Sequence, residues 1–187
     1  MDSPLTLSDE EVLRRSSTER ELFAHIIQRY EHKLRLYIQR KSHASPEDID
    51  DLLQNIFIKV YRNIKGFDPS LRFSSWIYRI AYNEMVDWYR KEKRTPHISF
   101  DADESILYTI AGDQDTTEKA LKEEQKKVVS TALSSLDQIY QDIVELRFYE
   151  EKSYEEIGDI LQIPPGTVAI RISRVKKILK TLLQNHA

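Results

Sequence analysis

Apolar side chains recur at intervals of three and four residues along most of the chain, and no segment of useful length alternates with the period of two that marks a strand. In the clearest segment, this spacing runs from Ile49 to Ile64 without interruption, until Gly66 ends the pattern. The same spacing predicts further helices over residues 18–41, 75–93, 117–133, 136–149 and 168–184. The sequence therefore predicts an all-α protein.

Helix start signals precede several of these segments. Ser45 is followed by Pro46 and by acids in the first turn, which is the usual composition of a helix N-terminus. We expect Thr167 to cap the last helix, after the turn QIPPG. Two further pairs match the capping box, in which each side chain bonds the other residue's backbone: Ser8 with Glu11 and Ser153 with Glu156.

The periodicity fails over residues 95–116, where Asp, Ser, Thr and Gly accumulate. A loop of this length is unusual inside one compact domain, so we interpret it as a flexible acidic linker between two small helical bundles. Residues 99–124 hold eight acidic and two basic side chains, and like charges keep a linker extended. The predicted organisation is an N-terminal extension (1–17), a first bundle (18–94), the linker (95–116) and a second bundle (117–187).

The composition limits the function classes. The 187 residues include no cysteine, which excludes disulfides, thiolate metal sites and a cysteine nucleophile. The N-terminus lacks the basic and apolar regions of a signal peptide, and no apolar run approaches the roughly 18 residues that span a membrane. We therefore expect a cytoplasmic protein without membrane insertion. The net charge of −3 hides two basic segments, since residues 90–94 hold four bases and one acid, and residues 160–187 hold five bases and no acid.

The most specific pattern lies near the C-terminus, where SYEEIGDIL, a Pro/Gly turn and a final helix form a helix-turn-helix. Apolar residues from Ile157 to Val175 can fill the angle between the two helices, and Gly158 permits their close approach. Arg171, Arg174 and their neighbours face outward, so the second helix is suited to a DNA major groove. A solvated basic helix with no partner is the alternative.

A second pattern, DDLLQNIF at residues 50–57, places polar side chains along an otherwise apolar helix. Asp51, Gln54 and Asn55 share one side of it through their i,i+3 and i,i+4 spacing. A docking surface, a solvated helix edge and, with His43 nearby, a metal or acid–base site are all compatible with this pattern. Acids in the first helical turns are explained by the helix dipole alone, so the pattern does not require catalysis.

Three segments together resemble one family. SYEEIGDILQIPPGTVAIRISRVKKIL resembles the −35-reading region of bacterial extracytoplasmic-function sigma factors. DDLLQNIF and FSSWIYRIAYNEMVDWYRKEKR resemble the core-binding and −10-reading regions of the same family. The likeness covers about residues 19–183, in the family's order and spacing. It implies that the first bundle is a region 2-like domain and the second a region 4-like domain. The implied partners are promoter DNA and core RNA polymerase, through the clamp of its largest subunit and the flap.

The resemblance also implies a set of site residues. The polymerase-docking residues are Asp51, Gln54, Asn55 and Phe57. The −10-reading residues are Phe67, Trp76, Arg79, Ile80, Asn83 and Arg90. The −35-reading residues are Thr167, Ala169, Ile170, Arg171, Ser173, Arg174 and Lys177.

Some of these positions have a competing interpretation or depart from the family. Trp76 and Ile80 would border a pocket for a flipped base, and plain core packing is the alternative for both. Asn55 stands where the family usually has Glu. Ala169 and Ile170 stand where basic or small polar residues are usual, so apolar contact with a thymine methyl would replace hydrogen-bond readout there.

Two other function classes are open at this stage. A self-sufficient helix-turn-helix regulator would bind duplex DNA tightly by itself, in a salt-dependent manner, although a sensor bundle has no need for the aromatic and basic third helix. An enzyme is disfavoured because the sequence lacks a glycine loop, a nucleophile arrangement and metal-ligand spacing, and we expect no cofactor. By resemblance, we expect an anti-sigma protein as a further partner. The resemblance also implies a path for the acidic linker toward the polymerase active-site cleft, and a solvated, extended tether is the alternative for the linker.

Overall fold

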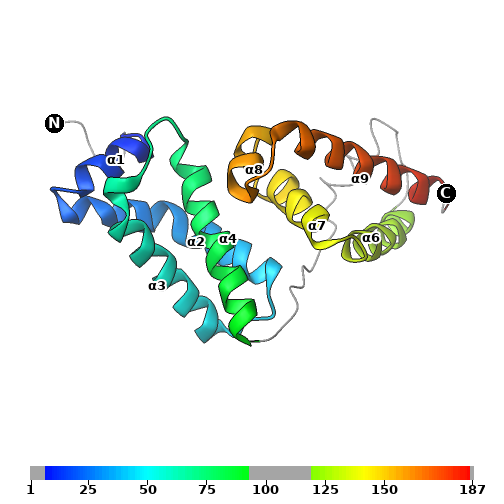
Figure 1. The fold of residues 1–187 in the computed structure, drawn as a ribbon. Coiled ribbons are helices and arrows are strands. Elements are labelled where there is room, and N and C mark those ends of the chain that lie inside the picture. Colours follow the sequence, from blue (N-terminus) through cyan, green and yellow to red (C-terminus); the bar gives the residue numbers. More distant parts are fainter. Residues whose placement is uncertain (1–6, 93–118, 186–187) are drawn as a thin grey trace. The chain divides into compact units, whose positions relative to one another are not determined.

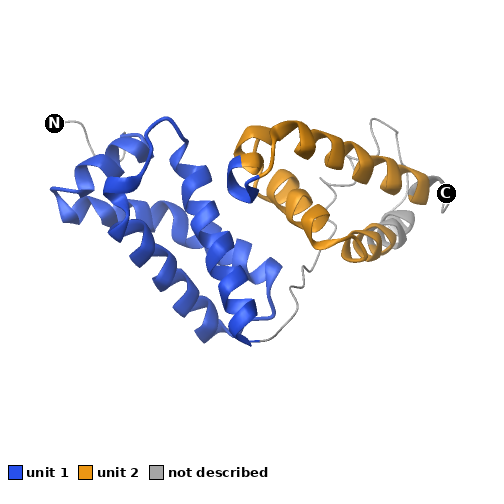
Figure 2. Cartoon of the chain, in the orientation of Figure 1, with its two compact units in different colours: residues 1–96, 159–162 blue, residues 97–158, 163–187 orange. Residues whose placement is uncertain are grey.

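The computed structural model describes residues 7–92 and 119–185, and every regular element in these two stretches is helical (Figure 1). The described residues fall into two compact units, which Figure 2 colours separately; residues 159–162 take the colour of the first. The first unit contains α1 (Asp9–Ser16), η1 (Arg20–Leu22), α2 (Phe23–Lys41), α3 (Pro46–Arg62), η2 (Ile64–Gly66) and α4 (Phe73–Glu92). The second contains mainly α6 (Lys119–Ser134), α7 (Gln138–Val144), the π-helical turn η3 (Glu145–Tyr149), α8 (Tyr154–Leu161) and α9 (Pro165–Asn185).

The prediction of an all-α protein is thus confirmed for the described residues. The linker predicted over residues 95–116 lies outside them. Within the two described stretches, no helix combines the length and the apolar character needed to cross a membrane.

The first unit is a bundle in which α3 packs against both α2 and α4. α3 begins as predicted, with Pro46 as its first residue. The Ser45 hydroxyl accepts the Asp48 N–H at 3.1 Å, while the Asp48 carboxylate accepts the Ser45 N–H at 3.3 Å. Ile56 and Val60 on its apolar side are fully buried. Local capping therefore starts the helix, and burial of one stripe then orients it.

Polar contacts also tie α4 to its neighbours. An ion pair between Lys59 and Glu84 joins α4 to α3. The Tyr89 hydroxyl donates a hydrogen bond to the Lys41 carbonyl and joins α4 to the end of α2. These contacts set the rotation of α4 in the bundle, and with it the face that α4 leaves exposed.

Residues 9–16, which the sequence placed in an N-terminal extension, form the docked helix α1. Ser8 caps this helix by accepting the Glu11 N–H at 3.2 Å. The capping box is not completed, because the Glu11 carboxylate turns to two arginines of its own helix. α1 packs on α2, α4 and η2 with Val12 and Leu13 buried. Burial of two such side chains contributes roughly 3–6 kcal/mol, so α1 is part of the first unit.

The second unit encloses its core between α6, α7 and α9. The fully buried residues of this core are Val129, Leu133, Val144, Val175 and Leu179. α8 begins with the predicted capping box, since the Ser153 N–H donates to the Glu156 carboxylate at 2.9 Å and the Glu156 N–H donates to the Ser153 hydroxyl at 3.2 Å. This cap fixes the start of the first helix of the helix-turn-helix.

The turn between α8 and α9 requires glycine at position 158. A Cβ placed there would lie 2.7 Å from the carbonyl oxygen of Ile163, and the Gly158 carbonyl accepts the Ile163 N–H at 3.1 Å. α9 begins at Pro165, earlier than predicted, so the prediction that Thr167 is its N-cap was wrong. The Thr167 N–H already donates to the Pro164 carbonyl at 2.9 Å. The fixed φ and missing N–H of proline suit the first helical position, and they outweigh the capping preference of threonine.

Candidate nucleic-acid interface

One side of α3 is exposed and carries the polar residues of DDLLQNIF. Asp51, Gln54 and Asn55 all lie in this stripe, and Ile58 continues it with 39% of its surface accessible. Phe57, which was predicted with them, is 8% exposed and belongs to the buried core of the bundle. α3 therefore presents a polar stripe with one apolar residue, which we call the α3 stripe, while Phe57 supports it from inside.

The neighbouring acid Asp50 has a partner within the chain. Arg35 Nη1 lies 2.7 Å from Asp50 Oδ1, and this hydrogen bond raises the pKa of the Arg35 guanidinium. His43, which suggested a metal or acid–base site, is exposed. Over residues 7–92 and 119–185, no three His, Cys, Asp or Glu side chains gather as metal ligands.

An aromatic cluster lies where the loop after η2 joins α4. Ring centroids of Phe67, Phe73 and Trp76 are 5.1 to 6.0 Å apart, and Tyr30 meets Phe73 edge-on at 5.3 Å. Such contacts contribute about 0.5–1.5 kcal/mol each beyond burial. Trp76 is 7% exposed, so it takes part in core packing, the alternative that the sequence left open. Phe67 is half-buried and is the accessible ring of the three.

The other predicted residues of α4 form a row that leads away from this cluster. Arg79 and Ile80 are half-buried, whereas Asn83 and Arg90 are exposed. Counted from Trp76, Arg79, Ile80 and Asn83 follow the i+3, i+4 and i+7 spacing of one helix face, and Arg90 lies seven residues beyond Asn83 on that face. The row combines an apolar side chain, an amide and cations, which are the groups that contact an unpaired base and its phosphates.

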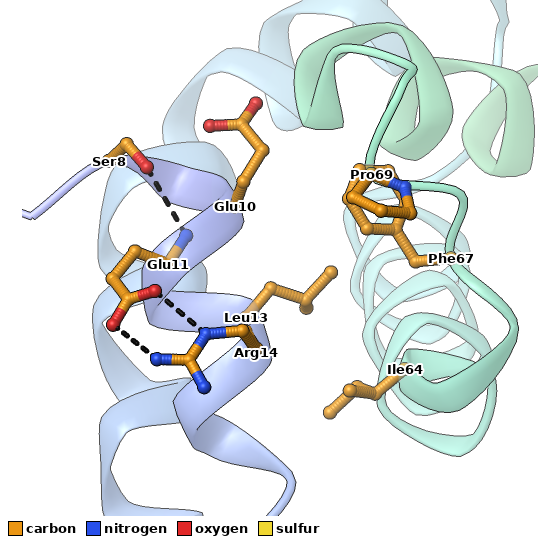
Figure 3. Close-up of a pocket in the computed structure, with 8 residues that line it drawn as sticks. All are labelled: Ser8, Glu10, Glu11, Leu13, Arg14, Ile64, Phe67 and Pro69. Atoms are coloured by element: carbon orange, nitrogen blue, oxygen red, sulfur yellow. Dashed lines mark hydrogen bonds and ion pairs between the residues drawn. The ribbon is translucent and has the colours of Figure 1, made fainter.

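A pocket of about 300 Å³ lies between α1 and the loop that precedes α4 (Figure 3). The residues that line it are Ser8, Glu10, Glu11, Leu13 and Arg14 from the N-terminal segment, with Ile64, Phe67 and Pro69 across from them. Glu10, which no sequence pattern singled out, accepts the N–H of Phe73 through its carboxylate at 3.0 Å. This contact joins residues 63 positions apart, and no local pattern reveals it.

In the second unit, α9 carries an exposed row of apolar and basic side chains. Ile170 is 71% exposed, and Ser173, Arg174 and Lys177 follow it on the same side. The two remaining predicted residues near the start of the helix are half-buried: Thr167 and Ala169. An isoleucine beside a hydroxyl and cations suits a groove lined by thymine methyls and phosphates. We call this row the α9 row.

Tyr140 on α7 holds the two arginines of α9. The guanidinium carbons of Arg171 and Arg174 lie 5.6 and 5.7 Å from the ring centroid, and Arg174 Nη1 donates a hydrogen bond to the hydroxyl at 3.1 Å. The buried Nη1 of Arg171 has no hydrogen-bond partner among the described residues. Cation–π contacts contribute about 0.5–1 kcal/mol at exposed sites. No sequence pattern marks Tyr140, because only packing brings α7 against α9.

Known proteins resemble both units of this chain. A family model of sigma-70 region 2 matches residues 26–95, and a model of sigma-70 region 4 matches residues 120–179. The chain is 30% identical over 184 residues to the ECF RNA polymerase sigma-E factor of Haemophilus influenzae, with 95% of this chain and 96% of the relative covered. It is 32% identical over 174 residues to the ECF RNA polymerase sigma factor SigW of Bacillus subtilis, with 89% and 91% covered.

Two solved structures share the fold. CnrH, in complex with the cytosolic domain of CnrY, is similar with a TM-score of 0.64 and 22% identity, over 96% of this chain and 99% of that one. The sigma factor RpoE of Bartonella quintana, in complex with the anti-sigma factor NepR, is similar with a TM-score of 0.59 and 18% identity, over 87% of this chain and 96% of that one.

Proposed function

The chain belongs to the extracytoplasmic-function sigma factors of bacterial RNA polymerase, and from this premise we propose that it binds core polymerase, recognises −10 and −35 promoter elements, melts the DNA and so initiates transcription. Sigma factors are initiation factors rather than catalysts, so the polymerase supplies the chemistry. One observation carries the proposal: a sigma region 2 unit and a sigma region 4 unit occur in one chain, each with an exposed row of suitable side chains.

The α3 stripe is the proposed docking surface for core polymerase. Asp51 and Gln54 are both exposed, one turn of helix apart, so they can pair with side chains of a partner helix at the same time. Ile58 adds an apolar contact at the end of the stripe. Asn55 offers only a neutral hydrogen bond where a carboxylate would make a charge-assisted one.

The −10 element is proposed to bind at the loop after η2 and along the row on α4. Phe67 and Ile80 are accessible enough to contact an unstacked base, whereas Trp76 supports them from the core. Asn83 is exposed and supplies the amide that bonds a base edge. Arg79 and Arg90 are proposed to bind the phosphates on either side of that base.

The −35 element is proposed to bind the α9 row. Ile170 contacts a thymine methyl, and Ser173 bonds a base edge or a phosphate. Arg174 and Lys177 neutralise phosphates, which makes the affinity dependent on salt. Arg171 is held over Tyr140 beside this row and supports the surface from α7.

A regulatory partner follows from the structural relatives. CnrH and RpoE of Bartonella quintana are both known in complex with another protein, the latter with an anti-sigma factor. We propose that this chain is likewise held by an anti-sigma protein until a signal releases it. We also propose that it acts in the cytoplasm, where the polymerase acts.

The test is binding to purified bacterial core RNA polymerase, measured by co-elution in size-exclusion chromatography. The double variant Asp51→Arg/Gln54→Ala changes two exposed side chains and leaves the core of the bundle intact. Gln28→Ala, an exposed change on α2, is the matched control. We expect the wild type and the control to co-elute with the polymerase and the double variant to elute alone. A wild type that fails to bind core at low salt, yet binds duplex DNA tightly by itself, would replace this proposal with a stand-alone regulator.

A further inference from the structure

The N-terminal helix α1 is held in the first unit by two separate sets of polar contacts. In the first set, Asp9 accepts hydrogen bonds from the Tyr30 hydroxyl and from Arg29 Nη1, each at 2.6 Å. Burial, together with the bond to Asp9, raises the pKa of the Tyr30 hydroxyl well above its usual range. The hydroxyl therefore stays protonated and donates at any physiological pH. This set anchors α1 to α2.

The second set is a single contact that joins α1 to α4. The Glu10 carboxylate accepts the N–H of Phe73, which is the first residue of α4. This N–H is one of the four at a helix start that no intrahelical carbonyl satisfies. The preceding side chain, Arg72, has only donors and cannot serve as the acceptor. Glu10 therefore caps α4 from another helix, and its charge also suits the positive end of the helix dipole.

The position of Phe73 sets the end of the loop that precedes α4. At the other end of this loop, the Asp68 carboxylate accepts the Ser70 N–H at 2.9 Å and shapes a local turn. Figure 3 shows Glu10 on the α1 side of the pocket, with Phe67 and Pro69 across from it. Because Phe73 also contacts the ring of Phe67, the Glu10 contact affects both the end of the loop and its accessible aromatic ring.

We propose that α1 is a brace for the −10-reading loop and that Glu10 is a positioning residue for promoter recognition. This inference rests on the proposed function, in which this loop and α4 read the −10 element. Glu10 itself does not contact DNA. It keeps the first turn of α4 wound, so that Phe67 and Asn83 are in place before a base arrives. A loop that must be ordered by the base binds it more weakly.

Three variants of α1 test this proposal, two at Glu10 and one at the neighbouring Glu11. Glu10→Ala removes the acceptor, while Glu10→Gln keeps an oxygen that accepts the Phe73 N–H. Glu11→Ala is the matched control, because the Glu11 carboxylate bonds only side chains within α1 in the contacts described here, Arg14 and Arg15. Each full-length variant is assembled with core polymerase and bound to a promoter that the wild-type holoenzyme has selected from a random duplex library.

Three quantities are measured: the affinity for core polymerase, the preference for the selected −10 sequence over a scrambled one, and the same preference at the −35 sequence. For Glu10→Ala we expect the −10 preference to fall about fivefold, as for loss of a helix cap, with the other two quantities unchanged. Glu10→Gln and Glu11→Ala should keep the wild-type preference. In addition, hydrogen exchange at the Phe73 amide should accelerate in Glu10→Ala only, a readout that needs no promoter.

If Glu10→Ala lowered the affinity for core polymerase and the preference for both DNA elements to the same degree, Glu10 would be a general structural residue and the proposal would be refuted. An unchanged −10 preference would do the same. A wild-type holoenzyme that selects no promoter sequence would overturn the proposed function itself, and the brace with it.

Discussion

The turn of the helix-turn-helix offers a prediction in which two known effects oppose each other. Replacing glycine by alanine inside a helix normally stabilises it by about 1 kcal/mol. At Gly158 the added Cβ would lie 2.7 Å from the Ile163 carbonyl oxygen, a backbone atom that no side-chain rotation can move. Overpacking of this kind costs about 1–3 kcal/mol. The shift that relieves it also disturbs the Ile163 N–H bond to the Gly158 carbonyl, worth about 1 kcal/mol. We therefore expect Gly158→Ala to lose about 1–3 kcal/mol.

The assay has to separate the two units of the chain. Both tryptophans, Trp76 and Trp88, lie in the first unit, so tryptophan fluorescence reports on that unit alone. Hydrogen exchange in peptides of α8 and α9, together with the melting temperature of the second unit, reports on the turn. In a domain of this size the melting temperature should fall by about 4–8 °C for each kcal/mol lost. The fluorescence transition should not move.

Gly166→Ala is the matched control, since a Cβ there has no atom within 4 Å. Gly166 lies in the first turn of α9, and the change should leave stability equal or raise it by up to about 1 kcal/mol. If Gly158→Ala proved as stable as the wild type, or more stable, the steric argument for the turn would be refuted. Equal losses in both variants would show that loss of glycine, rather than the close approach, is responsible.

Three further predictions concern single side chains. Asn55→Glu should tighten binding to core polymerase about three- to tenfold in a titration at low salt, because a carboxylate makes a stronger hydrogen bond; unchanged affinity would place this residue outside the interface. Tyr140→Phe loses only the hydroxyl bond to Arg174 and should weaken holoenzyme binding to the −35 element about two- to threefold. Tyr140→Ala also loses the ring and should weaken this binding about tenfold. Equal effects of the two variants would contradict a role for the ring. Hydrogen bonds from two arginines lower the pKa of Glu11 from 4.5 to about 2. Because the folded-state pKa of Glu11 is lowered, the pairing stabilises the fold at pH values above the unfolded-state pKa, and this stability is lost as the pH falls through about 2. An NMR titration of the Glu11 carboxyl should therefore have its midpoint near pH 2. A midpoint near 4.5 would rule out the pairing in solution.

Features that depend on a few consecutive residues follow from the sequence alone. Ser45 caps α3 and the capping box at Ser153 is present, both as predicted, because each cap spans a single helical turn. The box predicted at Ser8 is only half formed, since the Glu11 carboxylate bonds Arg14 and Arg15 instead. The close approach at Gly158 also follows from a local pattern, a glycine four residues before the turn QIPPG. The start of α9 shows the limit of this reasoning, since Pro165 and Thr167 both favour a helix start and the proline prevails.

The sequence by itself therefore determined the all-α class, most helix spans and the exposed rows on α3 and α9, since helical periodicity decides which residues share a face. Only the tertiary structure decided what lies beneath and beside those rows. It placed Trp76 in the core, Tyr140 against two arginines of α9, and Glu10 at the start of α4. These contacts join residues tens of positions apart. They depend on how whole helices pack, and the spacing of side chains along one helix carries no information about the partner that packs against it.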